Sequence, residues 1–261
     1  MKALNIAATG MMAQELNVEV ISHNVANMRT TGFKRQRAEF QDLLYDNVRR
    51  MGAITSDTGT MVPAGVQIGM GVKTAATPRV MSQGSINLTE KDLDIAIRGD
   101  GFFRLRMPDG STAYTRAGSF ELDANGLLVT VDGYQVEPGI TVPNNARDLS
   151  ISSEGVVEVL IDGQTQATEL GQIQLARFIN RSGLEAIGDN LFLETTASGT
   201  PQVSTPGDTG FGTLLQSHLE QSNVNPVTEI SDLIAAQRAY EMNARIITGA
   251  DEMLSATANL R

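Results

Sequence analysis

Apolar residues recur at every seventh position near both ends of the chain, and this spacing constrains the fold more than any other feature. Near the N-terminus the repeat consists of Leu4, Met11, Val18 and Val25, with Ile21 three residues after Val18. Near the C-terminus it consists of Leu233, Tyr240, Ile247 and Leu254. A period of 3.5 residues is typical of a helix whose apolar stripe packs against another helix. The sequence therefore predicts a long terminal helix at each end.

Residues at the edges of these repeats indicate where the two helices end and begin. The first helix is expected to span about 27 residues, roughly 40 Å, and to stop at Asn27 and Gly32, because Asn and Gly tolerate the left-handed conformation of a helix end. The second should begin with Asn225 as the N-cap and Pro226 at the first helical position. Its length would be about 35 residues, roughly 50 Å.

The middle of the chain, from about residue 92 to 211, follows a different pattern. Short segments alternate in polarity, as where Phe103 and Leu105 flank Arg104. Turn dipeptides separate them: Asp109-Gly110, Asn125-Gly126, Asp132-Gly133, Glu154-Gly155 and Asp162-Gly163. This pattern is typical of antiparallel strands joined by tight turns. The predicted fold class is α+β, with coiled-coil terminal helices flanking an antiparallel all-β middle domain.

The same patterns predict four segments. Residues 1–32 would form the N-terminal helix and residues 85–215 the β domain, and residues 216–261 would form the C-terminal helix that pairs with the first. Residues 33–84 would be an extended linker with a long hairpin or loop. Residues 51–84 are rich in Gly, Thr, Ser and Met and alternate only weakly in polarity, and a connection of such length is usually functional.

Composition narrows the possible functions. The absence of cysteine excludes disulfides and thiolate sites, and the net charge of −10 disfavours nucleic acid as the main partner. No nucleophile–base pair or metal-ligand spacing is present, so we predict no enzyme activity, no cofactor and no small-molecule substrate.

The N-terminus lacks the uninterrupted apolar run of a cleaved signal peptide, and no stretch is long and apolar enough to span a bilayer. These rules alone would place the protein in the cytoplasm.

Apolar stripes on both terminal helices favour self-association. A two-helix pair leaves apolar side chains outside its seam, and burying each would contribute about 1.5–3 kcal/mol. If different patches meet on successive copies, the product is a helical filament. The plainer alternative is that both helices pack on the β domain as ordinary core. A third reading, from another class, is a surface adhesin whose helices form a stalk.

Two stretches resemble the paired terminal signatures of bacterial flagellar axial proteins. They are HNVANMRTTGFKRQRAEF, residues 23–40, and SNVNPVTEISDLIAAQRAYEMNARIITGADEML, residues 222–254. Residues 66–72, RGDGFFRL at 98–105 and IGDNLFLET at 187–195 make the similarity greatest to the distal rod members of the flagellar basal-body rod family. Proximal rod and hook-type axial subunits are the alternatives within the family.

This resemblance implies a structural subunit of the distal rod, the drive shaft that transmits torque to the hook. The two apolar repeats would pack along the axis as an inner coiled-coil tube around an export channel, and the loop after Gly32 would bridge neighbouring subunits. The basic cluster Arg29, Lys34, Arg35 and Arg37 would serve intersubunit contacts. The residues that match the N-terminal family motif are Asn24, Asn27, Thr31, Gly32 and Phe33.

The resemblance also implies partners and a location. The partners would be further copies of the chain, proximal rod proteins, the hook protein, the surrounding P-ring and L-ring proteins and the flagellar type III export apparatus. The protein would be exported without a cleaved signal peptide and would lie in the periplasm-spanning rod of the basal body, which replaces the cytoplasmic expectation.

Overall fold

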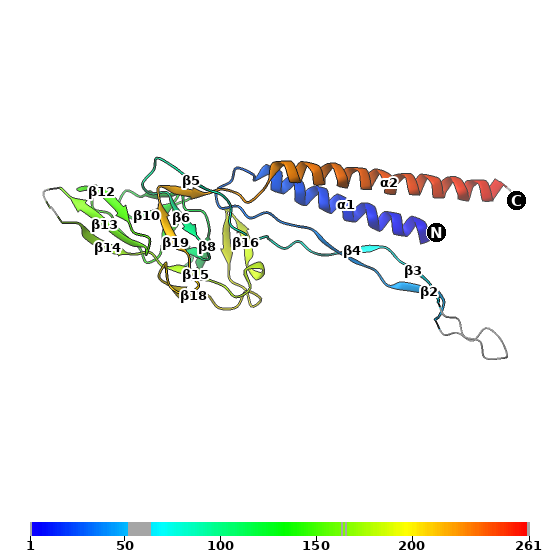
Figure 1. Cartoon of the computed structure of the whole chain (residues 1–261), viewed down its shortest axis with the longest axis horizontal. Coiled ribbons are helices and arrows are strands. Elements are labelled where there is room, and N and C mark those ends of the chain that lie inside the picture. Colours follow the sequence, from blue (N-terminus) through cyan, green and yellow to red (C-terminus); the bar gives the residue numbers. More distant parts are fainter. Residues whose placement is uncertain (1, 52–63, 163, 165, 260–261) are drawn as a thin grey trace. The chain divides into compact units, whose positions relative to one another are not determined.

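A computed structural model describes residues 2–51, 64–162, 164 and 166–259 (Figure 1). Helix α1, Lys2–Ala26, opens the chain and helix α2, Pro226–Asn259, closes it, with strands between them. Every strand pairing is antiparallel among these residues. The predicted class, terminal helices flanking an antiparallel β middle, is confirmed.

The chain divides into two compact units. The helical unit comprises the described parts of residues 1–25, 36–78 and 225–261. The β unit comprises those of residues 26–35 and 79–224.

In the helical unit, α1 and α2 lie side by side and run antiparallel (Figure 1). Gly10 of α1 lies against Asn243 of α2, whereas Asn24, later in α1, is hydrogen-bonded to Glu229, earlier in α2. The predicted N-cap is confirmed, because Asn225 Oδ1 accepts hydrogen bonds from Val227 N at 3.1 Å and Thr228 N at 3.4 Å. Neither helix, over its described residues, combines the length and apolar character needed to cross a membrane.

Two antiparallel strand pairs follow α1 within the helical unit. Strand β1, Glu39–Asp42, pairs with β4, Val72–Ala76, and strand β2, Tyr45–Arg49, pairs with β3, Val66–Gly69. The hydroxyl of Thr9 in α1 accepts a hydrogen bond from Val72 N at 3.3 Å. The predicted long hairpin or loop also includes residues 52–63, which lie outside the described residues.

The largest sheet of the β unit has the order β16-β17-β8-β7-β11-β10-β9, and β15 pairs with both β7 and β18. Its strands are β7 Phe102–Arg106, β8 Thr112–Thr115, β9 Phe120–Leu122, β10 Leu128–Thr130, β11 Gln135–Val136, β15 Leu175–Arg177, β16 Glu185–Gly188, β17 Leu191–Leu193 and β18 Gln202–Ser204. A second sheet consists of β12 Ala146–Ile151, β13 Val156–Ile161 and β14 Thr168–Gln172. Two further pairs join β5 Ile86–Leu88 to β20 His218–Glu220, and β6 Ile95–Arg98 to β19 Thr213–Gln216. A short 3-10 helix spans Arg181–Gly183.

Four of the predicted turn dipeptides are confirmed. Their glycines have the positive φ that such turns require, at Gly110 (86°), Gly126 (79°), Gly133 (85°) and Gly155 (84°). The fifth falls at Gly163, which lies outside the described residues.

The core of the β unit covers both faces of β7. Phe103 packs edge-on against Phe120, with ring centroids 5.0 Å apart, in the main apolar cluster. Its neighbour Phe102 belongs to a second cluster with Tyr114, Phe178 and Phe192. Phe103 and Leu105, the apolar residues of the alternating pattern, lie in the main cluster, and Phe102 on the opposite face of β7 is buried as well.

Candidate assembly surfaces and the N-terminal motif

Small residues line the seam between α1 and α2. Ala7 and Ala13 of α1 and Ala236 and Ala250 of α2 are buried. At Gly10, an added Cβ would lie 2.9 Å from Asn243 Nδ2. Because small side chains occupy the closest approach, most of the larger residues of the two apolar repeats are not enclosed by this pair of helices.

The structure places the predicted packing residues at different depths. Of the residues in the first repeat, Ile21 is buried, and the others are half-buried: Leu4, Met11, Val18 and Val25. In the second repeat Leu233 and Ile247 are half-buried. Tyr240 is 44% exposed and Leu254 is 40% exposed.

Helix α2 also presents apolar side chains that the sequence repeat did not single out. Ile234, Met242, Ile246 and Met253 are all exposed. At about 100° per residue, Ile234 and Met242 fall on the side of the helix opposite Ala236, whereas Ile246 and Met253 fall on its flank. An apolar face of this kind usually marks an interaction surface.

Asn24, the first residue of the N-terminal motif, joins three parts of the helical unit. Its Nδ2 donates to Gln36 O at 2.8 Å and to Glu229 Oε2 at 3.1 Å, and its Oδ1 accepts from Gln36 N at 2.8 Å. The side chain is buried, so the loss of any of these partners would leave an unsatisfied polar group. Asn24 thus holds α1, the returning chain at Gln36 and the first turn of α2 together.

The other motif residues belong to the β unit. Asn27 O accepts a hydrogen bond from Thr30 N at 3.2 Å, and Thr31 O accepts one from Asn190 Nδ2 at 3.3 Å. Gly32 donates its N–H to Glu220 O at 2.8 Å. Phe33 is buried. The motif therefore contributes local tertiary contacts within each unit.

Replacing Gly32 with alanine should lower the free energy of unfolding of the β unit by about 1–3 kcal/mol. Gly32 has φ +71°, and an added Cβ would lie 2.7 Å from Ala117 N. Gly133→Ala is the matched control, since Gly133 also has positive φ but nothing lies within 4 Å of its added Cβ. Urea unfolding of both variants should show the larger loss at Gly32, and equal losses would argue against the backbone clash.

A buried ionic cluster lies within the β unit. Glu220 accepts hydrogen bonds from Lys34 Nζ at 2.5 Å through Oε1 and from Arg116 Nε at 2.7 Å through Oε2. The exposed fractions of the three side chains are 1%, 2% and 6%. Gly84 N also donates to Glu220 Oε1, and Arg116 donates to Gly101 O at 2.5 Å and Gly99 O at 2.5 Å. These bonds satisfy charges that would be costly to bury alone.

The cluster corrects one sequence-based interpretation. The expectation that the cations after α1 all serve intersubunit contacts is wrong for Lys34, which is buried and paired inside its own chain. Burial lowers the pKa of Lys34 below its usual value, and the adjacent Glu220 carboxylate acts in the opposite direction. Arg37 is paired with Glu39 at 2.5 Å. Lys34 and Glu220 are so far apart in the sequence that no local pattern of residues indicates that they pair.

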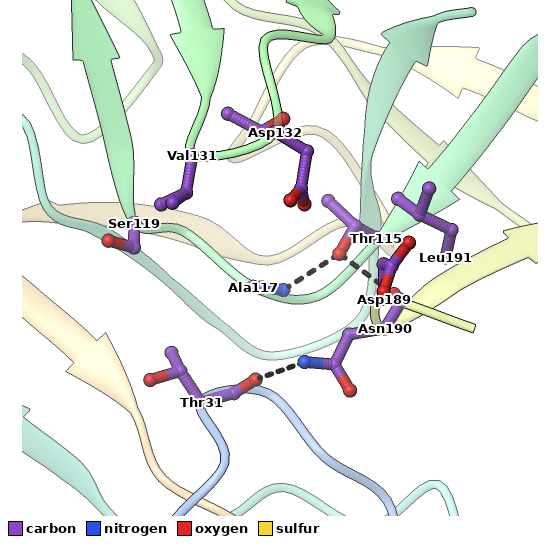
Figure 2. A pocket seen from close by; sticks show the side chains of 10 residues that line it. Thr31, Thr115, Ala117, Ser119, Val131, Asp132, Asp189, Asn190 and Leu191 are labelled. Atoms are coloured by element: carbon purple, nitrogen blue, oxygen red, sulfur yellow. Dashed lines mark hydrogen bonds between the residues drawn. The ribbon is translucent and has the colours of Figure 1, made fainter.

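A polar pocket of about 340 Å³ lies beside Thr31 in the β unit (Figure 2). Figure 2 shows Thr115 linked to Ala117 and Asn190, and Asn190 linked to Thr31. Asp132 and Asp189 also line the pocket. No group of three His, Asp or Glu side chains in the described part of the chain could hold a metal ion. Its link to the N-terminal motif is the hydrogen bond from Asn190 Nδ2 to Thr31 O.

Family comparisons match the three regions described above. A model described as "Flagella basal body rod protein" matches residues 4–34, "Flagellar hook protein FlgE/F/G D1 domain" matches residues 96–159, and "Flagellar basal body rod FlgEFG protein C-terminal" matches residues 215–260. These regions contain α1 with the motif, much of the β unit, and α2.

Individual relatives match over nearly their whole length. The chain is 58% identical to the flagellar basal-body rod protein FlgG of Caulobacter vibrioides, over 100% of both chains. It is 51% identical to FlgG of Agrobacterium fabrum, over 98% of this chain and 97% of the relative. It is 46% identical to FlgG of Buchnera aphidicola from Acyrthosiphon pisum, over 99% of both. The chain therefore belongs to the flagellar basal-body rod protein FlgG family.

Proposed function

We propose that this chain is a structural subunit of the distal rod of the bacterial flagellar basal body. The observation that supports this most is its end-to-end similarity to flagellar basal-body rod proteins, at 58% identity for the relative from Caulobacter vibrioides. The family models that match both ends are also named for the rod. On this account the protein lies in the part of the flagellum that crosses the periplasm and contributes to motility mechanically, with no catalysis.

The subunit assembles through its terminal helices. Exposed apolar residues on α2, and the half-buried positions of the α1 repeat, remain available to other copies. Their burial would contribute about 1.5–3 kcal/mol per large side chain. The helices of many copies, α1 from Lys2 to Ala26 and α2 from Pro226 to Asn259, would form a coiled-coil inner layer along the axis. The β domain, residues 85–215, would face outward and receive the rings.

The segment 33–84 acts as a long hairpin that bridges neighbouring subunits and stiffens the shaft. Its support is the antiparallel pairing of β1 with β4 and of β2 with β3. The partners are further copies, the proximal rod proteins, the hook protein and the P-ring and L-ring proteins. The flagellar type III export apparatus would deliver the protein, and no signal peptide would be cleaved from it.

A hook-type axial subunit is the second candidate. Two of the matching family models name the hook protein or the FlgEFG group rather than the rod alone. The rod assignment is preferred because relatives named FlgG align over at least 96% of their own length.

Expression of this chain in a flagellated bacterium that lacks its own distal rod gene tests the assignment. Swimming on soft agar and complete rods in purified basal bodies are expected. A hook-type subunit would instead restore motility to a strain that lacks the hook gene. A chain that restores neither strain would contradict the proposed function.

In the free subunit, both terminal helices should be removed by protease before the β unit is cleaved. Isolated helices without partners are marginally stable, and α2 in particular is exposed along most of its length. Limited trypsin digestion followed by mass spectrometry should give a stable fragment that retains residues 79–224. Equal resistance of the whole chain would contradict the idea that the helices await other copies.

A further inference from the structure

A small cavity of about 80 Å³ lies beside the buried ionic cluster of the β unit. Three cations line it together with one carboxylate and the glycines of the turn between β6 and β7: Lys34, Arg116, Arg181, Asp100, Gly99 and Gly101. We call this space the cationic cavity. A water molecule takes up about 30 Å³ in the liquid, so the cavity has room for about two or three waters or for one small anion.

The charges around the cationic cavity do not balance. Lys34 and Arg116 are both buried, and in the described part of the chain they share one carboxylate, that of Glu220. Arg181 and Asp100 form an ion pair at 2.5 Å, and both side chains are partly exposed. Three cations against two carboxylates leave one positive charge. Because an unmatched charge is costly to bury, an anion in the cavity would stabilise the folded β unit.

Two of the lining cations have hydrogen-bond donors to spare. Lys34 Nζ carries three N–H donors, and the described residues supply two acceptors, Glu220 Oε1 and Ser82 O, the latter at 2.9 Å. The guanidinium of Arg181 carries five N–H donors, and its hydrogen bond among the same residues goes to Asp100. Both cations can therefore donate to a further acceptor without losing a present partner.

The wall of the cavity is held in place by the protein alone. Ile97 O, Gly99 O and Gly101 O all accept hydrogen bonds from the guanidinium of Arg116. Gly99 N donates to Gln83 Oε1 at 3.1 Å, and Gln83 Nε2 donates to Ile97 O at 2.7 Å. The turn between β6 and β7 is thus fixed from two sides, so a ligand would enter a largely pre-formed site.

The electrostatics of Lys34 agree with this interpretation. Burial lowers the pKa of Lys34, and the positive charges of Arg116 and Arg181 lower it as well, whereas Glu220 raises it. An anion beside these cations would act in the same direction as Glu220 and would favour the charged amine.

We propose that the cationic cavity binds one small monovalent anion from solution, of the class of chloride, formate or acetate. Lys34 and Arg181 donate hydrogen bonds to it, and Asp100 and Glu220 repel a second negative charge, which disfavours sulfate and phosphate. Because Lys34 directly follows the N-terminal motif, the anion strengthens the attachment of that segment within the β unit. Binding at this site does not depend on assembly into a rod.

Thermal unfolding of the full chain in different sodium salts tests the site. Chloride, formate or acetate should raise the unfolding midpoint of the β unit when it replaces gluconate at constant ionic strength, because a ligand that binds only the folded state stabilises it by mass action. Gluconate is too bulky for the cavity and supplies the background. An unfolding midpoint that stays the same in all four salts would contradict the proposal.

Variants of the lining cations separate binding from a general salt effect. Arg181→Gln and Lys34→Met should each raise the chloride concentration needed for half of the effect by about tenfold or more, which corresponds to one hydrogen bond to a charged group. Arg147→Gln is the matched control, since Arg147 also forms an exposed ion pair with an aspartate, Asp162, at 3.6 Å. It should respond to chloride as the unaltered chain does.

The line width of the chloride NMR signal reports binding directly, whatever the stability of each variant. The unaltered chain and Arg147→Gln should broaden the signal, and Arg181→Gln should broaden it much less. Arg181→Gln leaves the buried pairs of Glu220 intact, so it decides the question even if Lys34→Met does not fold. No broadening by the unaltered chain, or equal broadening by Arg181→Gln, would contradict the proposal.

Discussion

Replacing Glu220 with leucine is expected to lower the free energy of unfolding of the β unit by about 3–5 kcal/mol. The change would leave Lys34 and Arg116 buried without their carboxylate, and Gly84 N would lose its acceptor. A buried charge without a partner costs far more than the intact pair contributes. Urea unfolding followed by circular dichroism would measure the loss.

Two further variants separate this cause from a general defect. Glu158→Leu removes an exposed carboxylate from β13 and should change the unfolding free energy by less than about 0.5 kcal/mol. Lys34→Met/Glu220→Leu should be more stable than Glu220→Leu alone, because one of the two stranded cations is gone. A Glu220→Leu protein within about 1 kcal/mol of the unaltered chain would show that the cluster is not needed for the fold.

Val18→Asp and Ile247→Asp should each abolish swimming while the β unit stays folded. Val18 is half-buried on α1, and Ile247 is half-buried on α2. If assembly buries either position, an aspartate there would cost about 4 kcal/mol, which weakens association roughly a thousandfold. Soft-agar motility and the β signal of circular dichroism would give the two readouts.

Ile179→Asp is the matched control for these variants. Ile179 is 82% exposed and belongs to the β unit, so the same kind of substitution is made outside the helices. It should swim normally. Normal swimming of both helical variants would count against the packing role assigned to the two repeats.

Local sequence signals were sufficient for the start of α2 and for four tight turns, although residues 218–220 of the predicted helical segment 216–261 form strand β20. The cap at Asn225 and the proline after it placed the start of α2, because capping uses side chains within three residues of the helix start. Gly32 and Asn27 marked the region where α1 stops, and the helix ends at Ala26. Turn dipeptides located four of the tight turns, since each needs a residue that tolerates positive φ.

Long-range pairings could not be predicted in the same way. Lys34 and Glu220 are 186 residues apart, and Asn24 and Glu229 are 205 apart. Nothing in the neighbourhood of either partner indicates the other, because the pairing follows from the tertiary fold. The apolar repeat also predicted two helices that pair, but not that small residues such as Gly10 and Ala236 would occupy the seam.

Electron microscopy of the full-length protein beside a version that lacks residues 1–25 and 225–261 tests the central claim most directly. The account predicts that the full chain forms filaments as its concentration rises and that the shortened chain stays monomeric with an intact β signal. Filaments from the shortened chain, or a full chain that remains monomeric with protease-resistant ends, would contradict it.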